Sequence, residues 1–245
     1  MNQKHCQLEL PISLGLACHA AHDAQSVMPP MYGAYGGVVS GGTFVHIMPY
    51  MELSALHGRV QAAAAASGGN FNSEVGNKIA TYQCPSDPTV GTESVRLGWS
   101  NGDVSYAGNF QVFGNPANAA DWVGKARFAA SFPDGQSNTL LFAEKVTRCG
   151  PAYSDPSAGG SWWGRGSDGP PGDTFSPVFA GGTAGRWTWQ TGNAAKFQNP
   201  TKYDTTACDY RAAASPHAGG INVCLADGSG RLGPGSTEGN RFAVK

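Results

Sequence analysis

The sequence predicts an α+β domain in which an N-terminal helix packs on an antiparallel β-sheet. Between residues 8 and 22 apolar side chains recur at three- and four-residue steps, which is typical of one helical stripe; they are Leu8, Ile12 and Leu16, and then Leu14 and Cys18. Beyond about residue 70 the apolar period shortens towards two, in short segments separated by stretches rich in Gly, Pro and Ser, which is typical of strands. An order of helix first and strands later predicts the α+β class. No internal repeat indicates a solenoid or a propeller.

The first quarter of the chain is predicted to be mostly helical. Its expected elements are a helix over about residues 7–22, an ordered loop over 23–42, a short strand over 43–47 and a helix over 49–66. Pro11 and Pro49 are each expected in a first helical turn, where a missing N–H costs nothing. Gly68 and Gly69 are expected to end the second helix.

The rest of the chain is predicted to form the sheet. Its candidate strands are residues 78–83, 93–97, 104–107, 139–146, 186–190, 221–226 and 241–244. Residues 149–185 and 191–215 are far longer than hairpin loops, and insertions of this size carry binding surfaces or pack over a sheet. We expect a single domain over residues 1–245, with the sheet and its insertions over about 70–245.

Charge and hydropathy exclude two classes of partner. The 245 residues include 16 Lys and Arg against 17 Asp and Glu, which gives a formal net charge of −1. A chain without a basic excess lacks the field that draws proteins to phosphate backbones, so no nucleic acid is expected. No apolar run approaches the roughly 18 residues of a membrane helix, so no membrane span is expected in this chain. The first 20 residues match neither a signal peptide nor a lipoprotein signal convincingly.

Six cysteines leave the redox state of the chain open. None belongs to a CxxC pair, so the zinc-ribbon, redox and haem-attachment patterns are all missing from the sequence. An even number in a Gly-rich, weakly charged chain fits an exported protein with disulfides, although the spacing selects no connectivity. Buried free thiols are the equally weighted alternative.

Two sequence patterns resemble catalytic motifs, but their contexts argue against chemistry. Residues 98–102 fit GxSxG around Ser100, and Asp209 and His217 follow in the order of a hydrolase triad. The adjoining Asn-Gly pair is a strong hairpin signal, however, whereas a nucleophile elbow needs a helix. Residues 164–169 fit GxGxxG, but two prolines follow at once and prevent a helix N-terminus from holding a pyrophosphate. We therefore expect no enzyme and no catalytic residues, with a hydrolase as the third hypothesis.

Histidines near the N-terminus do not predict a metal site. His19 and His22 lie three residues apart and could share a helix face, and His5, His46 and His57 lie elsewhere as further ligands. A metal needs at least one more ligand placed by the sequence, and helical histidines more often cap or pack. We expect no metal and no cofactor.

Paired tryptophans are the candidate ligand-binding residues. Trp187 and Trp189 alternate along one expected strand and so share a face, and Trp162 and Trp163 lie in the longer insertion. Such aromatics can stack on sugar rings, which makes a glycan an expected partner under this interpretation. Packing beneath the insertion is the more common use of such residues and remains the favoured alternative.

Five short blocks together resemble one known family. In chain order they are His19-Ala20-Ala21-His22-Asp23 with Met28-Pro29-Pro30, Met48-Pro49-Tyr50-Met51-Glu52, Cys84-Pro85-Ser86-Asp87-Pro88, Asp134-Gly135-Gln136-Ser137-Asn138-Thr139 with Glu144, and Ser215-Pro216-His217-Ala218-Gly219-Gly220 leading to Asp227-Gly228-Ser229. The last block contains a His, nine residues and then Asp-Gly. The chain resembles the prepilin-like envelope proteins of unknown function abundant in planctomycete bacteria, some of which are labelled extracellular solute-binding proteins. The resemblance runs from about residue 7 to residue 244.

The resemblance implies a type IV pilin-like architecture, a long N-terminal helix on an antiparallel sheet, in the cell envelope or outside the cell. In that family a cleavable leader and an apolar half-helix precede the region that matches Cys6, and Met1 falls where the polar half of the helix begins. The implied function is a non-enzymatic pilin- or pseudopilin-like structural or surface protein of the secretion or filament type. Its implied partners are further copies or other pilin-like subunits. An extracellular solute- or glycan-binding module is the alternative.

The His-x9-Asp-Gly motif has a simple physical interpretation. Asp227-Gly228 between two strand-like segments predicts a tight hairpin turn with Gly at positive φ. His217 precedes the incoming strand and is expected to hydrogen-bond the turn or a neighbouring loop. A lock that stabilises the fold is favoured over a ligand site.

Overall fold

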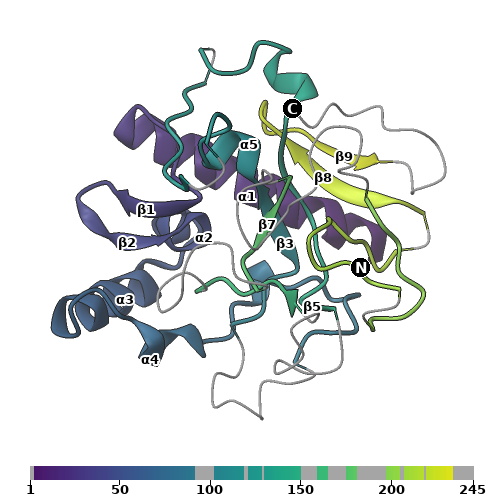
Figure 1. Cartoon of the computed structure of the whole chain (residues 1–245), viewed down its shortest axis with the longest axis horizontal. Coiled ribbons are helices and arrows are strands. Elements are labelled where there is room, and N and C mark those ends of the chain that lie inside the picture. The colour runs from purple at the N-terminus through teal and green to yellow at the C-terminus, as the bar shows by residue number, and fades with distance from the viewer. Residues whose placement is uncertain are drawn as a thin grey trace.

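The protein is described by a computed structural model over residues 3–91, 102–118, 121–128, 130–149, 159–164, 175–180, 197–204, 207–217 and 219–233, with side chains in the first helix from Leu8. Helix α1 (Gln3–Gln25) packs on a five-stranded sheet, as Figure 1 shows. The sheet order is β7 (Val178–Phe179), β3 (Tyr106–Asn109), β4 (Leu140–Glu144), β8 (Ile221–Leu225) and β9 (Gly230–Gly233). The predicted α+β class and N-terminal helix are confirmed.

The buried face of α1 is a stripe of small and medium side chains at three- and four-residue steps. Leu14, Cys18 and Ala21 are fully buried, whereas Leu16 points outward and is 57% exposed. The prediction that Leu16 belongs to the buried stripe is therefore wrong. Pro11 lies inside the helix rather than in its first turn, because the helix begins at Gln3. A proline there removes one helical hydrogen bond, which the buried packing of the following turns offsets.

The close approach of α1 to β8 depends on Gly15. A Cβ at this position would lie 2.3 Å from Sγ of Cys224 in β8. We expect Gly15→Ala to lower the free energy of unfolding by about 1–3 kcal/mol, because overpacking outweighs the better helix propensity of alanine. Gly58→Ala in α3 (Ser54–Ala66) is the matched control, since its Cβ meets nothing within 4 Å. This control should gain up to about 1 kcal/mol in urea denaturation. Equal effects of the two changes would contradict the packing.

The sheet is mixed, which corrects the prediction of a purely antiparallel one. β4 pairs antiparallel with β3 and with β8, and β8 pairs antiparallel with β9. β7 pairs parallel with β3, through Gly108 opposite Val178 and Asn109 opposite Phe179. β7 is two residues long and lies within the expected 149–185 insertion, so no periodicity could have revealed it.

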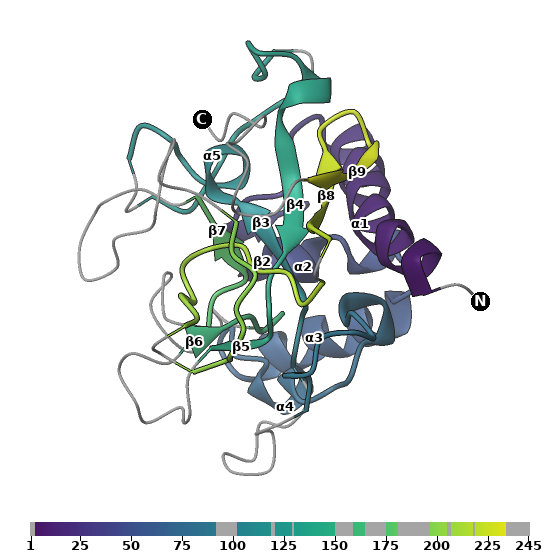
Figure 2. The same ribbon diagram turned by 90° about the vertical axis from the view of Figure 1, so that its right-hand side faces the viewer.

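Each face of the sheet has its own apolar layer. On the α1 side Cys224 and Phe142 join the largest buried cluster, which contains Leu14 and Cys18. On the opposite side Leu140, Val223 and Leu225 pack against Phe197 and Phe179 from the insertions. In Figure 2 α1 lies on one side of β4 and β8, and the short strands β5 (Arg148–Cys149) and β6 (Gly159–Gly160) lie on the other. The long insertions therefore cover a sheet face.

Two predictions for residues 23–47 are corrected. The expected loop contains the hairpin of β1 (Tyr32–Tyr35) and β2 (Val38–Gly42), and the expected strand at 43–47 is helix α2 (Thr43–His46). Gly36 and Gly37 make the hairpin turn with φ of 61° and 75°, a signal present in the sequence. All four residues of α2 are buried, and a short run of consecutive buried side chains does not distinguish a helix from a strand.

The second expected helix is interrupted. The structure has a short 3₁₀ helix η1 (Met48–Tyr50), a break at Glu52 with φ of 60°, and then α3. The predicted stop is confirmed, since Gly68 and Gly69 have φ of 65° and 104°. Helix α4 (Asn72–Val75) and the 3₁₀ helix η2 (Ala80–Tyr82) follow, so the strand expected at 78–83 is wrong.

The other expected strands have three different outcomes. β4 and β8 confirm the expectations at 139–146 and 221–226, and β3 lies two residues beyond the expected 104–107. The expected strands at 93–97, 186–190 and 241–244 lie outside the described residues. The remaining short helices are α5 (Phe110–Phe113) and η3 (Gln136–Asn138). None of the described helices has the length and apolar character to cross a membrane.

A disulfide joins the two long insertions at their bases. Cys149, the last residue of β5, is bonded to Cys208 across a sequence separation of 59. Cys18, Cys84 and Cys224 are buried free thiols, and the side chain of Cys6 lies outside the described residues. Both interpretations of the cysteines therefore hold, each for part of the set. The disulfide is consistent with an extracytoplasmic location.

Candidate functional site

Three chemically reactive side chains from distant parts of the chain meet on the α1 side of the sheet. Cys84 follows η2, Glu144 ends β4, and His217 precedes β8. His217 Nε2 lies 3.1 Å from Glu144 Oε1 and 3.6 Å from Cys84 Sγ. All three ligand-type atoms lie within 4.8 Å of one another. We call these three residues the Cys-Glu-His cluster.

Glu144 is the buried centre of the cluster. Its side chain is 1% exposed. Its Oε2 accepts hydrogen bonds from Ser215 Oγ at 2.8 Å and from the Asn222 backbone N–H at 2.9 Å. Its Oε1 accepts one from Asn222 Nδ2 at 2.7 Å, in addition to the contact with His217. Four donors thus serve the four lone-pair directions of one carboxylate, which is how a buried charge is retained.

His217 is held in place through its backbone as well as its ring. Its N–H donates to Ser215 Oγ at 3.1 Å, and Asn199 Nδ2 donates to the carbonyl oxygens of Ser215 and His217. The ring nitrogen near Glu144 must carry a proton, because a carboxylate oxygen can only accept. The loop before β8 is therefore fastened to β4 by the Ser215 hydroxyl and the imidazole.

Cys84 is a protonated thiol in this environment. Its side chain is 2% exposed, and burial raises the pKa of the thiol to about 12, an effect that a hydrogen bond from the Ser86 backbone opposes and the negative charge of Glu144 strengthens. The thiolate is the nucleophilic form of cysteine, and it is disfavoured here. The nitrogen that faces Sγ is the same protonated Nε2 that faces Glu144, so it cannot take the thiol proton as a triad histidine does.

Asp87, three residues after Cys84, anchors the segment that carries the thiol. Its Oδ1 accepts from the N–H and hydroxyl of Thr89, and its Oδ2 accepts from Ser105 Oγ at 2.9 Å and from the Thr147 N–H at 3.0 Å. Burial raises the pKa of Asp87, and the hydrogen bonds from Thr89, Thr147 and Ser105 oppose that rise. The segment that carries Cys84 is thus anchored to Ser105, just before β3, and to Thr147, just before β5.

The Asp-Gly end of the motif lies at the other end of β8. Gly228 has φ of 81° in the turn to β9, as predicted, and Asp227 Oδ1 accepts from the N–H and hydroxyl of Ser229. His19 of α1 bonds the carbonyl oxygen of Ala226 through Nε2 at 3.0 Å. The two ends of the motif therefore serve different neighbours: His217 reaches the loop at Cys84, and the turn adjoins α1.

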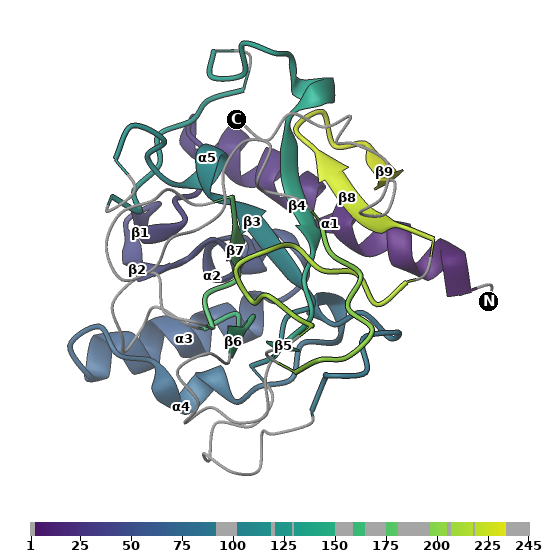
Figure 3. The same cartoon turned by 45° about the vertical axis from the view of Figure 1, so that its right-hand side comes forward.

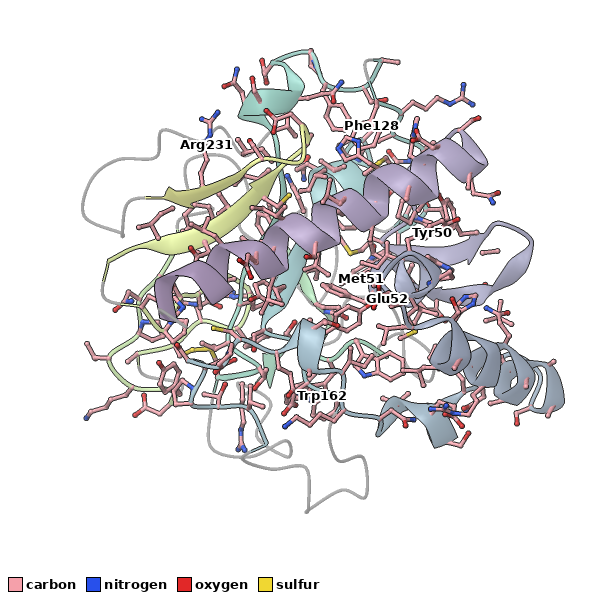
Figure 4. All side chains as sticks on the ribbon, turned by 180° about the vertical axis from the view of Figure 1, so that it is seen from behind. Tyr50, Met51, Glu52, Phe128, Trp162 and Arg231 are labelled. Carbon is pink, nitrogen blue, oxygen red and sulfur yellow. A yellow bond between two sulfur atoms is a disulfide. The ribbon has the colours of Figure 1, made fainter. Side chains whose placement is uncertain are left out.

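His19 and His22 use their rings for packing. The ring of His19 stacks on Phe128 with centroids 3.9 Å apart, and His22 Nε2 accepts a hydrogen bond from the Phe128 N–H. Figure 4 shows Phe128 over the C-terminal half of α1, whereas Trp162 lies on the other side of the helix. His46 is elsewhere in the core, between the carbonyl oxygens of Gly33 and Gly41. Among the described residues these histidines do not join the Cys-Glu-His cluster.

The candidate tryptophans are placed in different surroundings. Trp163 is fully buried, and its Nε1 donates to the carbonyl oxygen of Asn77, so protein covers both faces of its ring. Trp162 is partly exposed and stacks on Phe175, with ring centroids 4.2 Å apart. Trp187 and Trp189 lie outside the described residues.

The hydrolase pattern is only partly visible. Ser100 lies outside the described residues, as do residues 165–169 of the GxGxxG pattern. Asp209 forms a bidentate ion pair with Arg211, with distances of 2.8 Å to Nε and to Nη2. The described contacts of His217 are with Glu144, Cys84, Ser215 and Asn199. Asp209 thus pairs with an arginine rather than with the histidine of the hypothesised triad.

A surface pocket of about 550 Å³ lies beside α5. Its lining includes polar side chains from Gln111, Asn115, Asp121 and Lys125, together with the ring of Phe132. A volume of this size falls within the range of small-molecule sites, roughly 300–1,000 Å³. The sequence patterns did not indicate this pocket, although Asp134 and Thr139 of one motif block line it, because the rest of its lining comes from α5 and from two loop segments.

Four of the five motif blocks meet at the two ends of β8. The blocks of Cys84, Glu144 and His217 form the Cys-Glu-His cluster, and the block of His19 reaches the Asp227-Gly228 turn. The remaining block forms η1, and Figure 4 shows Tyr50, Met51 and Glu52 beside the middle of α1. Each block by itself indicates no site in the sequence. Only the order of the five blocks along the chain suggests that they belong together.

Comparison with known proteins gives a family but no described activity. A family model described as "Protein of unknown function (DUF1559)", whose short name SBP_bac_10 carries a solute-binding label, matches residues 6–239. No match was found among curated proteins or among solved structures. The family match covers nearly the whole chain, including both ends of β8. The chain therefore belongs to the DUF1559 family.

Proposed function

We propose that this chain is a non-enzymatic structural or surface protein of the cell envelope, of pilin- or pseudopilin-like design, which works in a secretion machine or a filament. The observation that carries the proposal is the position of α1. The helix lies along one face of the sheet, and Figure 3 shows its N-terminal end extending beyond the edge strand β9. A helix that is buried on one side and extends past the domain is suited to be a spine on which subunits assemble.

The chemistry of the Cys-Glu-His cluster supports a structural role over catalysis. Its carboxylate accepts from four donors, and its thiol is buried and protonated. The imidazole nitrogen that faces the thiol carries a proton, so it does not act as a general base towards Cys84. The contacts at both ends of β8 join strands, loops and α1 to one another. Such an arrangement stabilises a fold and, in the metal-free protein, leaves no activated nucleophile within the described part of the cluster.

The experiment locates the native protein and its cysteines in cells that express it. Cells are quenched in acid, free thiols are alkylated under denaturing conditions, and the cysteines are mapped by mass spectrometry in envelope, cytosol and sheared-filament fractions. We expect an envelope protein with Cys149 and Cys208 oxidised, and Cys18 and Cys84 alkylated as internal controls. Co-sedimentation with sheared filaments would support assembly. A cytosolic protein with Cys149 and Cys208 reduced would refute the proposal.

The pocket beside α5 favours a second candidate function, the binding of a small extracellular solute. The pocket combines the ammonium group of Lys125 and the carboxylate of Asp121 with an aromatic wall, which suits a small polar molecule. A thermal-shift screen of sugars, amino acids and organic acids tests this function, with Lys125→Ala as the matched variant. A hit that the variant weakens would favour this function. If no compound changes the melting temperature and no glycan of a panel changes the Trp fluorescence, both solute binding and glycan binding are refuted.

A further inference from the structure

The Cys-Glu-His cluster has the composition of a metal site as well as that of a hydrogen-bonded lock. Sulfur, imidazole nitrogen and carboxylate oxygen are the three ligand types that Zn²⁺ prefers. They come from three segments that the rest of the fold holds in place: the Asp87-anchored loop, the end of β4 and the loop before β8. We propose that Cys84, Glu144 and His217 bind one Zn²⁺ ion through Sγ, Oε1 and Nε2, with water as the fourth ligand.

Two of the three distances between ligand atoms are close to those of tetrahedral coordination. Zinc bonds of about 2.3 Å to sulfur and about 2.0–2.2 Å to nitrogen and oxygen place neighbouring ligand atoms roughly 3.4–3.6 Å apart. His217 Nε2 lies 3.6 Å from Cys84 Sγ and 3.1 Å from Glu144 Oε1. Closing the site requires side-chain movements that also bring Cys84 Sγ and Glu144 Oε1, which lie within 4.8 Å of each other, to this spacing. In a catalytic triad the two ring nitrogens of the histidine face different partners. Here one nitrogen, Nε2, faces both Cys84 and Glu144, which suits an ion bound by all three side chains.

The groups that would orient the ligands are already present. Asn222 Nδ2 donates to Glu144 Oε1, while Ser215 Oγ and the Asn222 N–H hold Oε2, so the carboxylate would bind the ion through one oxygen. Such supporting hydrogen bonds fix ligand orientation in metal sites. Access is provided on the His217 side, where the side chain is 16% exposed.

Charge balance also favours a divalent ion. When the ion binds, the thiol proton passes to solvent and the ring proton moves from Nε2 to Nδ1, so that the imidazole stays neutral and Nε2 is free to bind the ion. A carboxylate, a thiolate and a neutral imidazole carry a charge of −2 in sum, which one Zn²⁺ neutralises. An all-oxygen ion such as Mg²⁺ or Ca²⁺ would meet only one suitable ligand, and Cu(I) would need softer partners than a carboxylate.

Co²⁺ titration of the metal-free protein tests the site, since thiolate-bound tetrahedral Co²⁺ has charge-transfer and visible d–d absorption. We expect one ion per chain, displaced by Zn²⁺. Cys84→Ser should abolish the charge-transfer band, and His217→Gln should weaken binding by more than the roughly 10–100-fold that loss of a supporting residue costs. Cys18→Ala removes a buried thiol from elsewhere in the core and should leave the titration unchanged.

The wild-type protein supplies a measurement that does not depend on folded variants. At a free Zn²⁺ concentration about 100 times Kd, the Tm of the wild type should rise by roughly 5–10 °C, whereas Mg²⁺ should not change it. Circular dichroism shows whether each variant is folded. The proposal is overturned if the wild type binds no stoichiometric Co²⁺, if the charge-transfer band persists in folded Cys84→Ser, or if Zn²⁺ leaves the wild-type Tm unchanged.

Discussion

Glu144→Leu is expected to lower the free energy of unfolding by about 3–5 kcal/mol, because it removes an acceptor that four described donors share. The Asn222 N–H and the Ser215 hydroxyl would remain buried without a partner from Glu144. The ends of β4 and β8 and the loop at His217 would lose their common link. Urea denaturation followed by circular dichroism, in buffer with a chelator, measures the change in the metal-free protein.

Two comparisons isolate the contribution of the carboxylate. Glu144→Gln keeps the size of the side chain but turns one acceptor into a donor, so it should cost about 2–3 kcal/mol. Glu9→Leu on the exposed side of α1 should change stability by no more than about 0.5 kcal/mol. If Glu144→Leu were as mild as Glu9→Leu, the view of Glu144 as the buried centre of the cluster would be wrong.

Removal of the Cys149–Cys208 disulfide is expected to cost about 4 kcal/mol. The bond closes a long loop, with a sequence separation of 59, and the loss of that constraint mainly stabilises the unfolded chain. The two cysteines also pack with Val146 and Ala214 in a small apolar cluster beneath the insertions. The measurement is urea denaturation of the double variant Cys149→Ala/Cys208→Ala.

A chemical control accompanies the double variant. Dithiothreitol should lower the stability of the wild type by a similar amount and leave the double variant unchanged, because only the wild type has a bond to reduce. A double variant as stable as the oxidised wild type would show that the insertions are held by packing alone.

Strong local patterns made part of the fold predictable. The helical stripe of α1, the strands β4 and β8 and the turn at Gly228 each follow from residues close together in sequence. β7 could not be found in this way, because two residues have no period and their pairing with β3 depends on a crossover. The prediction of a strand at 43–47, where the structure has α2, was wrong for a related reason: four consecutive buried side chains suit a strand and a helix equally well.

The candidate site was less predictable than the fold. The His-x9-Asp-Gly motif points to His217, but Cys84 is one of six cysteines without a CxxC pair, and Glu144 is a single residue of a short block. Cys84 and His217 are 133 positions apart in the chain, and only tertiary structure brings them to 3.6 Å. The missed signal was that separate motif blocks each contributed one ligand-type side chain. The expectation of no metal rested on the histidines near the N-terminus, which the structure assigns to packing.

A double-mutant cycle between His217 and Glu144 is the most direct test of the central claim, which is that the motif histidine acts by holding the fold together. The cycle compares unfolding of the wild type, His217→Ala, Glu144→Gln and the double variant in urea with a chelator present. We expect a coupling free energy of about 1.5–3 kcal/mol, typical of a hydrogen bond to a charged group. Additive effects of the two changes, with no coupling, would contradict the claim.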